Sequence, residues 1–258
     1  MGEFILQTGT ALHETDANFE FLPTRNLDLF AVKKNGTSTG STEIAVLTAD
    51  SNYQTFSLQT GTPLHETDAN FQFLLAPNHD LFAIKKNGTA TGSTEVAILT
   101  TDSGYQAFGL QTGTPLHETD GAFQFTLAEN RDLIGIKKAN TGTGSTEICI
   151  LSADSNYQAF TLQTGTALHE TGDNYEFSFA PNRDLFAIKK NATGTGSTEV
   201  AVLSAASNYQ AFTLQTGTAL HETDHTFTFG ITVDRNLFSV KKSNTGTGST
   251  EVHIIRLA

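Results

Sequence analysis

The sequence lacks several residues on which common functions depend. It contains no tryptophan, one methionine and one cysteine in 258 residues. The single cysteine, Cys149, excludes a disulfide within the chain and stands where other copies of the repeat described below have alanine or histidine. No apolar run is long enough to span a bilayer, and the N-terminus shows no signal peptide. We therefore expect no membrane insertion, and the sequence indicates no particular compartment.

Positive charge is also scarce. The chain has 15 Lys and Arg residues against 27 Asp and Glu residues, which gives a formal net charge of -12. A surface of this sign repels phosphate backbones and anionic lipids. Nucleic acid is therefore not an expected partner.

One segment, Leu-Gln-Thr-Gly-Thr-x-Leu-His-Glu-Thr, occurs five times at a constant spacing of 52 residues. Repeats of about 40 to 50 residues that are rich in short strands are typical of propeller blades, whereas helical repeats show a period of 3.6. No 3.6 period is present. The copies begin at Leu6, Leu58, Leu110, Leu162 and Leu214.

Each repeat contains four stretches with the composition of strands, separated by turn residues. In the first repeat, residues 19–22 and 56–60 alternate between apolar and polar, whereas residues 28–32 and 43–47 are apolar on both faces. Strands that are apolar on both faces belong in the middle of a covered sheet. The pattern predicts an all-β, five-bladed β-propeller with four-stranded antiparallel blades.

The chain ends predict how this propeller closes. The last repeat stops after its third strand, whereas the chain opens with an additional fourth strand, so the N-terminal strand is expected to complete the C-terminal blade. An open solenoid is the alternative, but it needs polar terminal repeats, and the terminal repeats here are as apolar as the others. The single predicted domain, 1–258, has blades at 17–64, 69–116, 121–168, 173–220, and 225–258 with 3–12.

Two turns that recur together in four of the repeats form the first candidate binding surface, which would give four sites, whereas the crossover described next would give five. They combine a tyrosine with asparagine and arginine, and an aromatic ring beside amide and guanidinium groups suits a sugar. The same residues are good turn formers, and a tyrosine at a strand start often packs in the core, so a structural role is the alternative. The candidates are Asn52, Tyr53, Tyr105, Asn156, Tyr157, Asn208, Tyr209, Asn78, Asn130, Arg131, Asn182 and Arg183.

The His-Glu-Thr crossover between repeats is the second candidate. Its five copies are spread around a propeller and cannot share one metal ion, so no metal site is predicted, although a calcium-dependent binder that uses Glu14 and Asp16 is a weaker alternative. In the structural alternative, His13 and Thr42 form a hydrogen bond that fixes the crossover. The candidates are His13, Glu14, His65, Glu66, His117, Glu118, His169, Glu170, His221 and Glu222.

The remaining polar repeats do not form a known catalytic pattern. The lysine pairs, Lys33-Lys34 through Lys241-Lys242, are expected to be balanced by glutamates such as Glu43. The sequence has no Gly-x-Ser-x-Gly elbow, phosphate-binding glycine loop or His-Glu-x-x-His motif. From this we expect no enzyme activity and no cofactor.

The five similar blades make the chain resemble the small β-propeller lectins, above all the five-bladed tachylectin-2 type. The resemblance covers the whole chain and lies in blade number, repeat length and internal similarity. It implies sugar pockets between adjacent blades, and several weak sites on one chain gain avidity. We therefore expect a multivalent carbohydrate-binding protein whose partners are glycans or glycoproteins. The alternative is a non-catalytic protein-interaction or adhesion scaffold, whether recently amplified or designed; the oligomeric state is left open.

Overall fold

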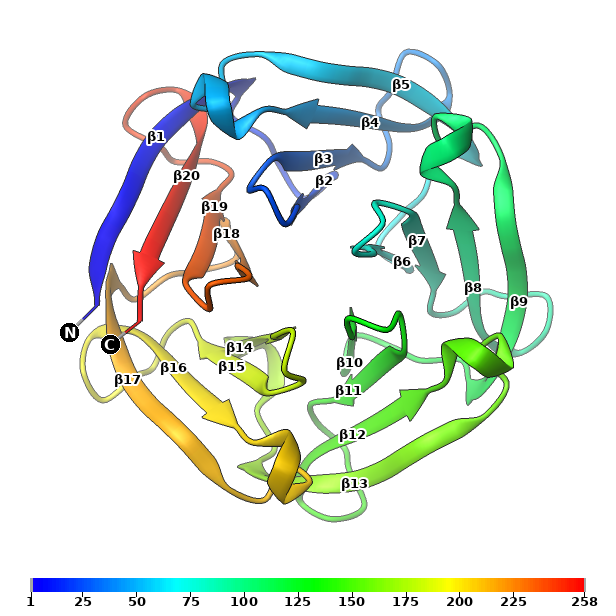
Figure 1. Ribbon diagram of the computed structural model, residues 1–258, viewed down its shortest axis with the longest axis vertical. Helices are drawn as coiled ribbons and strands as arrows, with labels where there is room; N and C mark the ends of the chain where they lie inside the picture. The colour runs from blue at the N-terminus through cyan, green and yellow to red at the C-terminus, as the bar shows by residue number, and fades with distance from the viewer. Residues whose placement is uncertain (1, 258) are drawn as a thin grey trace. The chain divides into compact units, whose positions relative to one another are not determined.

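The computed structural model describes residues 2–257, which form β-strands and short 3-10 helices (Figure 1). The strands pair into four-stranded antiparallel sheets, each with one consecutive set of strands. Blade 1 consists of β2 (Phe19–Pro23), β3 (Leu29–Lys33), β4 (Ser41–Leu47) and β5 (Phe56–His65). Blade 2 consists of β6 (Phe71–Leu75), β7 (Leu81–Lys85), β8 (Ser93–Leu99) and β9 (Phe108–His117).

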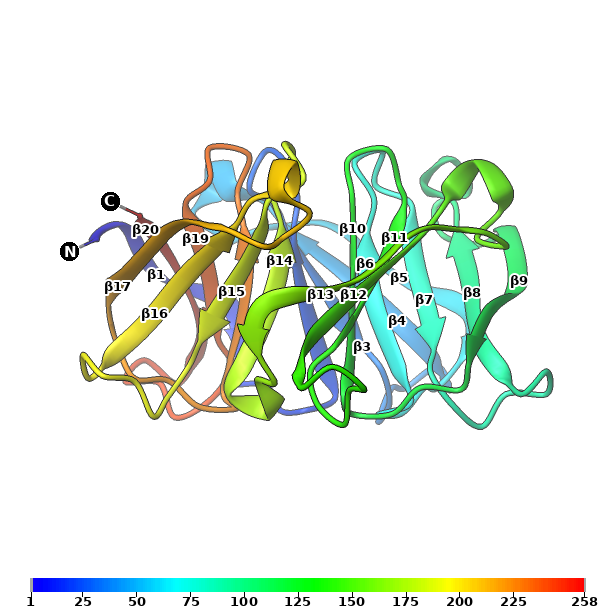
Figure 2. The ribbon, with the colours of Figure 1, turned by 90° about the horizontal axis from the view of Figure 1, so that it is seen from below.

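The next two blades repeat this order. Blade 3 consists of β10 (Phe123–Leu127), β11 (Leu133–Lys137), β12 (Ser145–Leu151) and β13 (Phe160–His169). Blade 4 consists of β14 (Tyr175–Phe179), β15 (Leu185–Lys189), β16 (Ser197–Leu203) and β17 (Phe212–His221). Figure 2 shows the two ends of blade 4, with the 3-10 helix η5 (Ala205–Ser207) at one end and the β15–β16 loop at the other.

The fifth blade joins the two ends of the chain. Its strand order is β1-β20-β19-β18, with β1 (Glu3–His13), β18 (Phe227–Ile231), β19 (Leu237–Lys241) and β20 (Ser249–Arg256). An ion pair of 2.6 Å between Arg256 and Glu3 accompanies this pairing. The prediction of a five-bladed β-propeller completed by the N-terminal strand is therefore confirmed. The predicted ends of the domain at residues 1 and 258 lie outside the described residues.

The chain divides into two compact units. One contains Gly121–Ser239 with the segments up to Leu6 and from His253 onward, and the other contains Gln7–Asp120 with Val240–Val252. Apolar clusters fill the space between neighbouring blades within each unit: blades 3 and 4 share one cluster, blades 1 and 2 another. The second strand of each blade, such as β3, is buried on both faces, as its composition predicts. The third strand, such as β4, alternates between buried and half-buried residues, so the expected burial on both faces is wrong for this strand. No helix in residues 2–257 has the length and apolar character needed to cross a membrane.

Side chains on the inner strands tie neighbouring blades together. The Gln124 amide donates to the Phe177 carbonyl at 2.8 Å and accepts from the Phe177 N–H at 3.0 Å. Glu20, in the equivalent position of blade 1, accepts from the N–H of Phe73 at 3.1 Å. Burial raises the pKa of Glu20 to about 7, although the nearby lysine ammonium groups and this hydrogen bond act in the opposite direction. A glutamine therefore fits this position better than an ionised glutamate.

Candidate functional site

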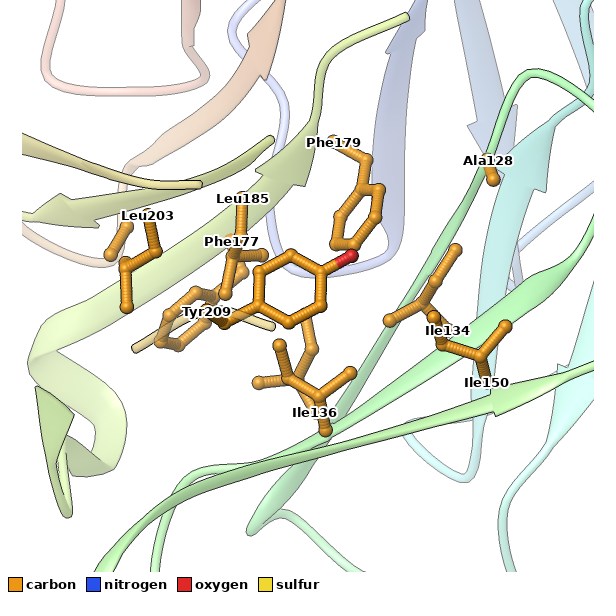
Figure 3. Packing of buried hydrophobic residues seen from close by; sticks show 11 residues of the cluster. Ala128, Ile134, Ile136, Ile150, Phe177, Phe179, Leu185, Leu203 and Tyr209 are labelled. Carbon is orange, nitrogen blue, oxygen red and sulfur yellow. The ribbon is translucent and has the colours of Figure 1, made fainter. Parts of the chain in front are cut away.

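The tyrosines of the first candidate surface lie in the core. Tyr53, Tyr105, Tyr157 and Tyr209 are between 1% and 3% exposed. Figure 3 shows Tyr209 surrounded by apolar side chains from blades 3 and 4, including Phe177, Leu185 and Ile136. These four rings therefore offer no face to a ligand, and the tyrosines have the structural role that was the alternative.

Each tyrosine hydroxyl also donates a hydrogen bond to the turn between the first two strands of its blade. The Tyr53 hydroxyl donates to the Leu27 carbonyl at 3.0 Å, and Tyr209 does the same to Arg183 at 3.3 Å. Burial raises the pKa of Tyr53 to about 12, with Asp28 adding to the shift. Tyr53 follows Asn52, and both have positive φ angles, 61° and 53°, which bulky residues adopt only when the surroundings fix them.

The polar residues of these turns mostly satisfy one another. Asn182 donates to Asp184 at 2.7 Å, and Arg183 donates to Asp132 of the preceding blade at 3.3 Å. Asn78 and Asn130 make the equivalent bonds to Asp80 and Asp132 at 2.8 Å. Arg131 also adopts a positive φ, 69°. The exposed Asn52, Asn156 and Asn208 are left-handed caps of the preceding 3-10 helices.

The glutamates of the second candidate surface hold loops in place. Glu66 Oε1 accepts from both the N–H and the hydroxyl of Thr37, at 2.6 and 2.9 Å. These hydrogen bonds lower the pKa of Glu66. The same pair recurs as Glu14–Thr245, Glu118–Thr89, Glu170–Thr141 and Glu222–Thr193.

The histidines of this motif act through their backbone. The Thr250 hydroxyl donates to the His13 carbonyl at 3.0 Å, and Thr42 donates to His65 in the same way. The predicted pairing of His13 with Thr42 is therefore wrong, because the crossover that leaves β1 lies against β20 of its own blade. The imidazoles of His13, His65, His117, His169 and His221 are exposed.

Carboxylates and imidazoles do not gather into a metal site. Within residues 2–257, no group of three or more His, Cys, Asp or Glu side chains is placed to hold a metal ion. Asp16, one of the two residues of the calcium alternative, accepts hydrogen bonds from the N–H and the amide of Asn18 at 2.8 and 3.3 Å. Glu14, the other, accepts from Thr245.

A hollow on one face of blade 4 combines apolar and polar side chains. Its volume is about 360 Å³, and Leu168 of blade 3 contributes one wall. We call it the blade 4 hollow. The other lining residues are Tyr175, Ala187, Lys189, Thr195, Glu199, Val200, Ala201, Phe212, Gln215, Thr216 and Gly217.

The register of the strands explains why this hollow forms. One row of paired residues runs across the four strands and consists of Phe177, Ala187, Ala201 and Gln215. The two central residues of this row are alanines and therefore small. In the next row, Lys189 pairs with Glu199, and Glu199 pairs with Gly217. Small residues at the centre and at Gly217 therefore leave space between larger side chains.

Blade 1 repeats the hollow with a volume of about 400 Å³. Leu12 of β1 supplies its wall from the adjacent sheet, and Ala31 and Ala45 form its floor. This is the blade 1 hollow. The equivalent polar residues are Lys33, Thr39, Glu43, Gln59 and Thr60, and Phe19 takes the place of Tyr175.

Some of the polar groups in the hollows form hydrogen bonds with one another. Glu199 and Glu43 each accept a hydrogen bond of 2.9 Å from a threonine, Thr195 and Thr39 respectively. Burial raises the pKa of Tyr175, and the nearby Glu199 carboxylate adds to the shift. Each hollow thus presents an ammonium group, a carboxylate and an amide around an apolar floor.

Sequence reasoning did not single out these hollow residues as a binding site. The charge pattern indicates only that the lysine and the glutamate of each repeat balance one another, and it does not mark the glutamine. A signal was present, because Lys, Thr, Glu and Gln are identical in all five repeats at these positions. The space itself depends on strand register and on the neighbouring blade, which a pattern of residue types does not supply.

Comparisons with known proteins bear on the fold. No family model and no curated protein matches the chain. The catalytic domain of the Coprinopsis cinerea GH62 α-L-arabinofuranosidase is a similar structure, with a TM-score of 0.54, 11% identity and 96% of each chain covered. The α-L-arabinofuranosidase PaAbf62A from Podospora anserina, solved in complex with cellotriose, has a TM-score of 0.51 and 9% identity, with 97% of this chain and 96% of that chain covered.

These two structures correct the expectation that the chain is not an enzyme. Both are glycosidases on a fold like this one, so the argument from repeated blades and absent motifs does not exclude catalysis. At such low identity the likeness shows the fold alone and assigns no reaction.

Proposed function

We propose that the chain binds carbohydrate in the repeated hollows between neighbouring blades. The observation that carries the proposal is the recurrence of one set of lining residues in two hollows, on blades 1 and 4. A sugar ring has apolar faces and a polar edge, and sugar-binding sites pair aromatic rings with hydrogen-bonding side chains. Tyr175 and Phe212 supply aromatic surface in blade 4, and Lys189, Glu199 and Gln215 supply donors and acceptors.

Repetition makes weak sites useful. A shallow hollow with a few polar groups binds one sugar weakly, but the hollows of blades 1 and 4 give one chain two such sites. Effective concentration then raises the overall affinity by ~10² to 10⁴. The proposal places the site away from the tyrosine turns, which are the turns that contain Tyr53, Tyr105, Tyr157 and Tyr209, because these four rings are buried.

A broad glycan array, probed with the labelled protein with and without EDTA, tests the proposal. We expect selective binding to one glycan class that free sugar inhibits and EDTA leaves unchanged. Loss of binding with EDTA would instead indicate the calcium-dependent alternative. A blank array would overturn the proposal and favour a protein-interaction scaffold.

Two variants locate the site on the array. The quadruple variant Lys33→Ala/Gln59→Ala/Lys189→Ala/Gln215→Ala removes polar groups from two hollows, and we expect at least a tenfold loss of apparent affinity. The matched control is Asn52→Ala/Asn208→Ala, which changes exposed asparagines of the tyrosine turns in the same two blades. A loss in the control with full binding in the quadruple variant would show that the hollows are not the site.

A further inference from the structure

The fifth blade departs from the others at the floor of the equivalent face. Blades 1, 2 and 4 have two alanines there, for example Ala187 and Ala201 in blade 4. Blade 5 has Ser239 and His253 at the corresponding positions of the repeat. A small floor is thus replaced by a hydroxyl and an imidazole ring.

The His253 ring is enclosed by aromatic side chains. It stacks on Phe227 with a centroid distance of 6.1 Å and an interplanar angle of 24°, and it lies 6.0 Å from Phe4 at 59°. Its Nδ1 lies 3.4 Å from the Ser239 hydroxyl. His253 is only 6% exposed, so the imidazole is fully accommodated on this face.

The two aromatic neighbours of His253 have counterparts in the blade 4 hollow. Phe227 corresponds to Tyr175 in the repeat, and Phe4 corresponds to Phe212. Tyr175 and Phe212 both line the blade 4 hollow, together with Ala201, the counterpart of His253. The imidazole therefore lies between the same two aromatic positions that border open space in blade 4.

The inner-strand aromatic ring is also covered in other blades. The ammonium of Lys85 lies 6.0 Å from the Phe71 ring centroid in blade 2, and Lys137 lies 6.0 Å from Phe123 in blade 3. These are distances at which a cation is attracted to a ring face. This ring stacks in every blade on the aromatic residue two positions further along its strand. In blades 2 and 3 a lysine ammonium lies near it as well, and in blade 5 the imidazole of His253 does.

We infer that His253 occupies, in blade 5, the place that a ligand ring takes in the hollows of blades 1 and 4. The binding places of the chain are therefore unequal, and the fifth is filled by its own side chain. The ligand class is a single ring with a face that stacks on the inner-strand aromatic and an edge that forms hydrogen bonds. This inference rests on the proposed function for the identity of the ring as a sugar.

Counting bound sugars tests the inference. The variant Ser239→Ala/His253→Ala restores the alanine pair of blades 1, 2 and 4 and is expected to fold for that reason. Equilibrium dialysis with the methyl glycoside of the sugar that the array selects should give one more bound molecule per chain. Ala201→His should give one fewer. Counts that stay unchanged in both variants would overturn the inference.

A second probe separates this inference from the proposed function. Crystals soaked in 4-methylimidazole, which is the ring of histidine itself, should show the ring against Tyr175 in the wild type. Density against Phe227 should appear in Ser239→Ala/His253→Ala but not in the wild type. With a blank glycan array, such density would leave the inference standing while the carbohydrate proposal fails. Absence of the ring from both places would overturn the inference.

Discussion

The tyrosine turn and the hollow belong to the same blade and are repeated with similar regularity, but their side chains meet different surroundings. Tyr209 is buried, and its hydroxyl donates to a backbone carbonyl. Lys189 and Glu199 instead border open space, and Gln215 beside them is exposed. Repetition alone therefore does not separate residues that complete the fold from residues available to a ligand. The two groups are separated by whether each polar atom already has a partner within the protein.

The largest expected effect comes from breaking the tyrosine turn. Tyr209→Ala removes a buried ring and leaves a cavity, which should lower the free energy of unfolding by about 3 to 5 kcal/mol. Tyr209→Phe should lose only about 1 kcal/mol, because it removes one hydrogen bond. Urea unfolding of both variants measures the difference. Equal, small losses in both would show that the turn does not depend on the buried ring.

The next effect concerns Glu20, a polar residue on an inner strand whose ionised carboxylate does not suit its buried position. The pKa of Glu20 is raised from its ordinary value of 4.5 to about 7, so the folded state binds a proton more tightly than the unfolded state. Its favourable contribution is present below pH 4.5 and is lost as the pH rises through about 7. Glu20→Gln should therefore stabilise the protein by about 1 to 3 kcal/mol at pH 8 and by little at pH 4.

Unfolding curves at the two pH values measure the effect of Glu20→Gln. Gln124→Glu is the matched control, because it places a carboxylate where the structure has an amide that both donates and accepts. The control should lose stability as the pH rises. A Glu20→Gln variant with the same stability as the wild type at pH 8 would contradict the raised pKa.

Smaller still is the expected cost of opening the hollow further. Lys189→Ala and Gln215→Ala remove side chains from the edge of the blade 4 hollow, where packing is incomplete. Each should change the free energy of unfolding by no more than about 0.5 kcal/mol. Thermal unfolding checks this against Tyr209→Phe. A loss above that of Tyr209→Phe would place these residues with the structural group.

The smallest effect concerns the exposed carboxylates of the crossover. The pKa of Glu66 is lowered by its hydrogen bonds to Thr37, so its contribution to stability is present above its ordinary pKa of 4.5 and is lost as the pH falls through the lowered value. Glu66→Gln should melt slightly below the wild type at pH 7, and the difference should vanish at pH 2. A difference that persists at pH 2 would mean that the carboxylate charge is not its source.

The sequence predicts the fold well because the fold depends on periodic features. The strand patterns and the constant repeat spacing define the blades, and the orphan strand at the N-terminus predicts its pairing with β20. The site is harder to predict. A tyrosine such as Tyr53 suits a sugar by its residue type, but its backbone conformation directs the ring into the core. The hollow arises from two alanines and a leucine of the next sheet, none of which has chemistry that a motif search notices.

The pairing of β1 with β20 also sets the order in which the protein can fold. Glu3 and Arg256 are 253 residues apart in sequence, so this contact forms only after residue 256 has been synthesised. Loop closure over such a length costs entropy, and non-local pairing of this kind slows folding. Until then β1 is a strand without its partner, and an unpaired strand edge can recruit other chains. The pairing that completes the native blade thus also ends the period in which the edge of β1 is open to misassembly.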